Sequence, residues 1–172
     1  NPFGILDKTS NNISSFKIQG NSLAFMYITP VEDCIVDFGD GTGQTYAGNN
    51  LSTLVTYSYS ESNIYTIKII GNHSNFIASQ NTIEIIQISN SITNCSSMFS
   101  NSLHLTTILE TLTIPDSVTD CSRMFSNCRS LTVIPSTLTI PNSVTNCSFM
   151  FNSCLSLTEI PSTLTIPDSV TD

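Results

Sequence analysis

Positive charge is scarce in this sequence. Only five of its 172 residues are Lys or Arg, against 13 Asp or Glu, and the formal net charge is -8. Nucleic acids and anionic membrane surfaces are bound through clustered Lys and Arg side chains, and the few basic residues here are widely scattered. We therefore expect no nucleic-acid partner and no attachment to an anionic membrane.

Long apolar runs and catalytic signatures are also missing. No apolar segment approaches the roughly 18 to 20 residues that span a bilayer, so we expect no direct membrane insertion. His73 and His104 are the only histidines. The sequence has no Gly-flanked nucleophilic Ser, no carboxylate pair outside the turn at Asp37 and no Gly-rich phosphate loop. We therefore expect a protein that is not an enzyme and uses no cofactor.

Ser, Thr and Asn dominate what is present, with 27, 22 and 17 residues, alongside 21 Ile. Such a mixture of β-branched and small polar residues disfavours long helices and favours strands joined by turns. The sequence therefore predicts a mainly β fold. Because it begins at Asn1 without an initiator Met, we also expect it to be part of a longer protein.

A repeat with a fixed period of 26 residues occupies the second half of the chain. One block recurs at residues 91–99, 117–125 and 143–151 as SITNCSSMF, SVTDCSRMF and SVTNCSFMF, and a further copy starts at residue 169. A second block recurs at residues 131–141 and 157–167 as LTVIPSTLTIP and LTEIPSTLTIP, with a looser copy at 105–115. A unit this short cannot enclose its own core, so neighbouring units are expected to stack.

The alternation within each unit predicts which side chains face inward. Leu138 and Ile140 should point into the core and Thr137 and Thr139 outward, so that each unit gives one short strand to a parallel sheet. The segment at Asn94, Asp120 or Asn146 should begin a short helical or 3-10 turn. The conserved apolar column within the stack is expected to contain Met98, Met124, Met150, Phe99, Phe125 and Phe151.

This cadence, MFxxCxSLTxI followed by LTIPxSVT, resembles the BspA-like leucine-rich repeat over about residues 81–172. Proteins of that family are surface proteins of bacteria and some protists, with related copies in large viruses and phages. The resemblance implies a repeat solenoid with a role in adhesion or surface display. The chain departs from the commoner form by carrying Cys where related repeats often have Met or another apolar residue.

The first half of the chain has strands separated by turns instead of the repeat. Residues 34–38, 57–59 and 64–69 read as strands, and the glycines of residues 39–43 can adopt the positive φ of a tight turn. The FGDGT turn and the segment after Tyr59 resemble a PKD-type domain, a small immunoglobulin-like β-sandwich, over about residues 13–72. Phe38 stands in place of the usual Trp and should fill a core site. Asn63 stands in place of the usual Gly and should reach the left-handed region.

These patterns predict three regions: a linker at residues 1–12, a PKD-type sandwich at 13–77 and the repeats at 78–172. Residues 73–80 should be a polar junction, and the Ile-rich segment 83–88 an atypical first rung of the solenoid. Because the last unit stops at Asp172 without a polar cap, we expect further repeats or a partner beyond it.

Five of the six cysteines occupy repeat positions. Cys95, Cys121 and Cys147 share one position, and Cys128 and Cys154 share another, so the first set of three cannot pair fully. We expect buried free thiols that pack as small apolar groups. A disulfide within one unit is the weaker alternative. A zinc site is weaker still, since no close Cys pair or nearby His is present.

Two further features suggest ligand sites. Asp37 and Asp40 are weak calcium candidates in a Gly-rich turn, although both side chains are better explained as acceptors for turn amides. The second is a pair of exposed Thr files, a candidate binding face for protein or glycan, formed by Thr111, Thr113, Thr137, Thr139, Thr163 and Thr165.

Together these features predict a non-enzymatic, extracellular or cell-surface protein in which the repeats adhere to or display a protein or glycan. The alternative is a structural component of a phage or virus particle, such as a fibre, tail or capsid decoration, or of a surface appendage. In that case the partners are other structural subunits and the location is the virion. A minor alternative is ice binding, because flat Thr arrays with strand spacing match ice.

Overall fold

The computed structural model describes residues 12–20 and 23–172. The linker predicted at residues 1–12 therefore lies outside the described residues except for Asn12. The described part of the chain is mainly β, as its composition predicts, with eight strands. These are β1 (Ile13–Gly20), β2 (Leu23–Pro30), β3 (Cys34–Asp37), β4 (Gly43–Tyr46), β5 (Thr53–Ser58), β6 (Asn63–Ile70), β7 (His73–Ile77) and β8 (Thr82–Gln87).

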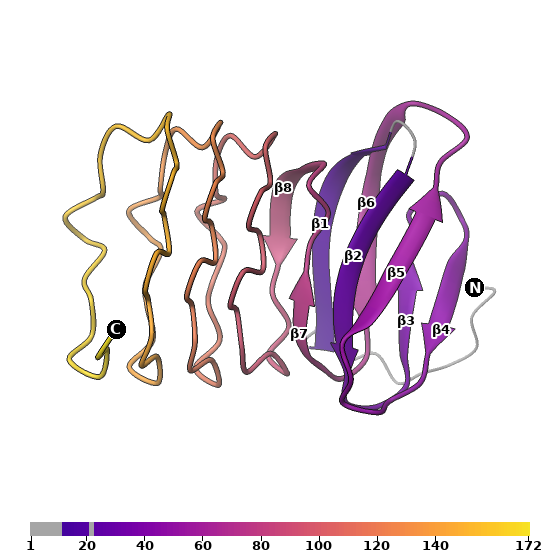
Figure 1. The fold of residues 1–172 in the computed structure, drawn as a ribbon, viewed down its shortest axis with the longest axis horizontal. Coiled ribbons are helices and arrows are strands. Elements are labelled where there is room, and N and C mark those ends of the chain that lie inside the picture. The colour runs from indigo at the N-terminus through magenta and orange to yellow at the C-terminus, as the bar shows by residue number, and fades with distance from the viewer. Residues whose placement is uncertain (1–11, 21–22) are drawn as a thin grey trace.

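The strands form two antiparallel sheets (Figure 1). One sheet has five strands in the order β4-β3-β6-β1-β8, and the other has three in the order β5-β2-β7. In β1 and β6 the alternate residues Phe16, Ile18, Ile67 and Ile69 are almost fully buried. They face Met26, Ile28 and Val55 of the smaller sheet across the core, which is the arrangement of an immunoglobulin-like sandwich.

The sequence located most of this part correctly. The predicted strands correspond to β3, the end of β5 and β6, and Phe38 fills a core site with 3% of its surface exposed. The turn glycines Gly39 and Gly41 have φ values of 82° and 92°. The prediction for Asn63 is wrong, because this residue begins β6 with extended backbone and pairs with Gly20.

The segment expected to be a polar junction is instead strand β7. It pairs with β2 in the smaller sheet, and His73 within it is fully buried. The Ile-rich segment expected to be a first rung is β8, which pairs with β1 at the edge of the larger sheet. Both segments join the sandwich because β1 and β2 each have an open edge that a further strand can satisfy. The predicted boundary after residue 77 stays a prediction.

After β8 the chain forms three 26-residue segments that we call unit 1 (residues 95–120), unit 2 (121–146) and unit 3 (147–172). They lie side by side next to the sandwich, coloured from pink to yellow in Figure 1. Backbone hydrogen bonds join them at a constant step: the amides of Thr119, Thr145 and Thr171 donate to the carbonyls of Thr93, Thr119 and Thr145 at 2.9–3.0 Å.

The strands predicted at the Leu-Thr-Ile tracts do not form, and in the described residues the parallel pairing between units is limited to isolated bridges. These join Asn94 to Asp120, Asp120 to Asn146, and Thr107 to Val133. Proline is the physical reason, because it lacks an amide donor. The amides of Leu138 and Val144 are used inside the unit, where they donate to the carbonyls of Pro135 and Pro141. The inward and outward alternation nevertheless holds: Leu138 and Ile140 are buried, and Thr137 and Thr139 are exposed.

The predicted helical turns are also absent from the units. Asn94, Asp120 and Asn146 do accept the amide two residues later, at 2.6–2.9 Å, as capping residues would. The next residue is left-handed in every unit, with φ of 57° at Ser97 and 54° at Arg123. A left-handed residue interrupts a helix, so the chain continues as single hydrogen-bonded turns.

The core is continuous from the sandwich into the units. A column of rings runs through it, in which Phe16, Phe76, Phe99, Phe125 and Phe151 follow one another at centroid distances of 5.5–5.7 Å. Of the eleven predicted column residues, only Cys147 and Phe151 in unit 3 are partly exposed. The nine buried ones are Cys95, Cys121, Cys128, Cys154, Met98, Met124, Met150, Phe99 and Phe125.

Candidate binding surface

The six Thr residues of the predicted binding face are all exposed, but they are not equivalent. The hydroxyls of Thr137 and Thr163 donate at 2.8 Å to the carbonyls of Glu110 and Ser136 in the preceding unit. The hydroxyls of Thr113, Thr139 and Thr165 have no hydrogen-bond partner among the described residues. The first file therefore holds the units together, and the second file is free to contact a ligand.

Other hydroxyls hold the units together in the same way. Ser117, Ser143 and Ser169 donate at 2.6–2.7 Å to the carbonyls of Ile92, Val118 and Val144. Such bonds satisfy carbonyls that a regular sheet would otherwise pair. The richness in Ser and Thr thus replaces the missing sheet, which composition alone does not reveal.

The cysteines form buried ladders of free thiols, and all six are unbridged. The thiols of Cys128 and Cys154 donate at 3.1 Å to the carbonyls of Phe99 and Phe125 in the preceding unit. Desolvation raises the pKa of Cys128 to about 12, and the hydrogen bond to Cys121, with burial, raises the pKa of Cys95. Because the thiolate is the reactive form, these thiols pack the core and are poor nucleophiles.

The two calcium candidates are occupied with local hydrogen bonds. Asp37 accepts the Gly39 amide at 2.9 Å, and Asp40 accepts the amide and hydroxyl of Thr42 at 3.0 and 2.7 Å. The hydroxyl of Tyr57 donates to the other oxygen of Asp40 at 2.5 Å. Partial desolvation alone would raise the pKa of Asp40, but the bonds from Thr42 and Tyr57 outweigh it and lower the pKa.

Among residues 12–20 and 23–172, no three His, Cys, Asp or Glu side chains lie close enough together to hold a metal ion. The Asp37 and Asp40 side chains thus have the arrangement of turn-stabilising groups, and further ligands are not at hand.

The two histidines lie in opposite environments. His104 is exposed, as its repeat position predicts, whereas His73 is buried with its Nδ1 atom 2.7 Å from the Gly71 carbonyl and its Nε2 atom 2.8 Å from Ser14 Oγ. A carbonyl only accepts, so Nδ1 carries the proton and the Ser14 hydroxyl donates to Nε2. Desolvation lowers the pKa of His73 to about 4. This Ser–His pair is sealed in the core and cannot reach a substrate.

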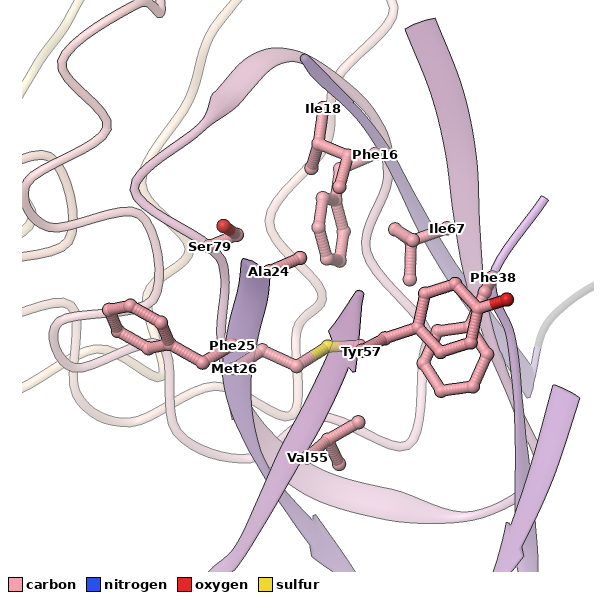
Figure 2. A pocket seen from close by; sticks show the side chains of 10 residues that line it. All are labelled: Phe16, Ile18, Ala24, Phe25, Met26, Phe38, Val55, Tyr57, Ile67 and Ser79. Atoms are coloured by element: carbon pink, nitrogen blue, oxygen red, sulfur yellow. The ribbon is translucent and has the colours of Figure 1, made fainter. Parts of the chain in front are cut away.

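The sandwich interior has almost no free space. A cavity of about 10 Å³ lies between the sheets, lined by side chains such as Phe16, Met26, Val55 and Ile67 (Figure 2). That volume is at the limit for a single water molecule, and the lining is apolar. The interior is therefore a packed core and not a ligand site.

Two larger hollows lie at the surface. One, of about 300 Å³, is at the end of unit 3, where Ile160 and Ile166 are more than half exposed although their equivalents in units 1 and 2 are buried. The other, of about 90 Å³, lies between β2 and unit 1 and is lined in part by Phe25 and Tyr27. Sequence reasoning missed these two rings. The uniformly apolar sequence of β2 hides its alternation, and only the partners of the strand reveal which side is outward.

No helix in the described residues has the length and apolar character needed to cross a bilayer. Comparison of the chain with protein-family models, with curated proteins and with solved structures found no match.

Proposed function

We propose that the chain is a non-enzymatic surface protein in which a PKD-type sandwich carries a BspA-like leucine-rich-repeat solenoid, and that the solenoid binds a protein or glycan outside the cell. The observation that carries the proposal is the constant 26-residue step of the bonds between units. A constant step presents the same side chains at regular intervals, and regular faces of this kind suit multipoint binding.

The proposed contact face is the free Thr file, Thr113, Thr139 and Thr165. It is uncharged and hydroxylated, so it suits a ligand that offers many polar groups. The non-enzymatic assignment is supported by the environment of His73, whose only nucleophile-like neighbour, Ser14, is fully buried with it.

The test is a binding screen of the 172-residue protein against an array of neutral and acidic oligosaccharides and against fibronectin, collagen and fibrinogen. In a variant with Thr113, Thr139 and Thr165 all changed to Val, we expect affinity for the ligand found to fall about tenfold or more, since three hydroxyl contacts are lost. Thr45→Val, an exposed change on β4, is the matched control. Unchanged affinity in the triple variant would overturn the assignment of this face.

A structural role in a particle or appendage is the second candidate, and the apolar end of unit 3 favours it. Exposed apolar surface of this kind is typical of contacts between subunits. Sedimentation velocity tests it: self-association that Ile166→Glu abolishes would support a structural subunit, and a monomer at all concentrations would count against one.

Ice binding is less well supported. The Leu-Thr-Ile tracts form no strand, and Thr137 and Thr163 use their hydroxyls for bonds between units. A flat array of free hydroxyls at strand spacing is therefore lacking. Purified protein should cause no thermal hysteresis.

A further inference from the structure

The groove between β2 and unit 1 has two exposed aromatic rings on one side. Along β2 the side chains of Met26 and Ile28 are buried, while Phe25 and Tyr27 are 40% and 41% exposed. Figure 2 shows Met26 extending into the interior and Phe25 on the other side of the strand. Strand alternation alone gives this arrangement, but a strand whose outward positions only met solvent would normally carry polar residues there.

Polar groups without partners surround the rings. The Tyr27 hydroxyl and the Gln80 carboxamide have no hydrogen-bond partner among the described residues. Asn101 is held in place, because its Oδ1 atom accepts from Asn127 at 2.5 Å and its Nδ2 atom donates to Ser100 Oγ at 3.1 Å. One N–H of the Asn101 amide remains available. The groove therefore offers a hydroxyl, a free amide and an oriented donor beside two rings.

The surroundings of the groove carry no formal charge, although the chain has a net charge of -8. Strands β2, β5 and β7 contain no Asp, Glu, Lys or Arg, and neither do residues 74–83 and 97–103. An ionic ligand would find no opposite charge here. The chemistry that remains, apolar rings flanked by neutral donors and acceptors, matches a neutral molecule with both C–H faces and many hydroxyls.

We infer that this groove is a binding site for a neutral glycan. The C–H face of a sugar ring would pack on Phe25 and Tyr27, and sugar hydroxyls would bond with Tyr27, Gln80 and Asn101. A free volume of about 90 Å³ holds several water molecules, which a sugar ring would displace. This site is separate from the Thr file, so neither site depends on the other.

The sandwich would then contribute to binding in addition to spacing. The sequence-based assignment gave the sandwich a spacer role only. A glycan chain seated in the groove would lie beside Ser100 and Asn101 of unit 1, so the site requires both parts of the chain.

Isothermal titration calorimetry with the 172-residue protein tests the inference. The probes are cellohexaose, mannohexaose, xylohexaose and N-acetylchitohexaose, with polygalacturonate as a charged comparison. We expect at least one neutral hexasaccharide to bind. Tyr27→Ala should weaken that binding about tenfold, and Tyr27→Phe and Gln80→Ala about threefold each, because the first removes a ring and the others a single hydrogen bond.

Ile64→Ala is the matched control, since Ile64 is 54% exposed on β6 of the other sheet. It and Thr139→Val should leave hexasaccharide binding unchanged. Circular dichroism establishes that each variant is folded, and the conservative variants Tyr27→Phe and Gln80→Ala keep the test valid if a truncation to Ala unfolds the protein. Absence of binding to every neutral probe, binding to polygalacturonate alone, or full affinity in the Tyr27 and Gln80 variants would each overturn the inference.

Discussion

Gly39 and Gly41 both have positive φ, but only Gly39 is confined. A Cβ atom on Gly39 would lie 2.6 Å from the carbonyl oxygen of Thr66, whereas a Cβ on Gly41 would meet nothing within 4 Å. The turn after β3 is therefore pressed against β6 at one residue and open to solvent at the other.

We predict that Gly39→Ala lowers the free energy of unfolding by about 2 to 4 kcal/mol, because strain and a backbone clash add. Gly41→Ala should cost only about 1 kcal/mol, the cost of the positive φ alone. Urea unfolding of the two variants measures the difference. Equal losses would show that the contact with Thr66 does not constrain the turn.

Ser102 carries the one buried side-chain oxygen or nitrogen in the described residues that has no hydrogen-bond partner. It stands 26 residues before Cys128, at a position where units 2 and 3 have Cys donating to a carbonyl. Unit 1 has kept a hydroxyl where the neighbouring pattern uses a thiol.

Ser102→Cys is predicted to raise the free energy of unfolding by about 1 kcal/mol, because it removes an unsatisfied hydroxyl and fills the same space with sulfur. Ser102→Ala separates these effects, since it removes the hydroxyl without adding volume. Thermal unfolding gives the comparison. Destabilisation by both substitutions would mean that the hydroxyl is satisfied in solution.

At the scale of the unit, the sequence predicted which side chains are buried but not how neighbouring backbones are joined. The alternation at residues 137–140 separates buried from exposed positions whether or not a strand forms, because it depends only on extended backbone. Pairing depends on which amides are free, and Pro135 and Pro141 accept the amides of Leu138 and Val144. Periodicity does not carry that information.

The hydroxyl bonds between units give a testable consequence. Ser143→Ala should lower stability by about 1 kcal/mol, because the Val118 carbonyl loses its donor. Ser136→Ala, at an exposed residue whose hydroxyl has no partner in the described part of the chain, should change stability by less than about 0.5 kcal/mol. Chemical denaturation distinguishes the two. Equal effects would contradict a role for the Ser143 hydroxyl in joining the units.

At the scale of the molecule, the sandwich and the units share one core, and His73 lies where they meet. Its ring contacts Ser14 of β1, and its backbone amide and carbonyl bond with Ser91 at 3.3 and 3.0 Å. Sequence reasoning placed His73 in a polar junction, because the residues around it are polar. Their hydroxyls and amides are in fact turned toward one another inside the protein.

The buried His73 predicts a loss of stability in acid. Its pKa is lowered from 6.5 to about 4 by desolvation, so its contribution is fully present above the unfolded value and is lost as pH falls from 6.5 toward 4. Between pH 7.5 and 5 the loss should be about 2 kcal/mol. His73→Gln, which cannot titrate, should flatten this part of the curve of unfolding free energy against pH. An unaltered slope in the variant would exclude His73 as the cause.

The pairing of β8 with β1 predicts the behaviour of fragments. A fragment ending at Ile77 leaves the edge of β1 unpaired and Phe16 without its contact strand, whereas a fragment ending at Ser89 retains β8. We predict that only the longer fragment, residues 1–89, gives a cooperative unfolding transition. Dispersion in a proton–nitrogen correlation spectrum reports folding. A well-folded shorter fragment would support the boundary expected after residue 77.

The constant step between units also determines which changes of length the gene can undergo. Loss of residues 121–146 would join Asp120 directly to Cys147, and each remaining hydroxyl, thiol and ring would meet a neighbour of the same kind as before. A deletion of one codon would instead shift every later side chain against its neighbour. Recombination between copies is therefore tolerated in whole steps of 26 codons, and selection should remove every other slippage event in this region.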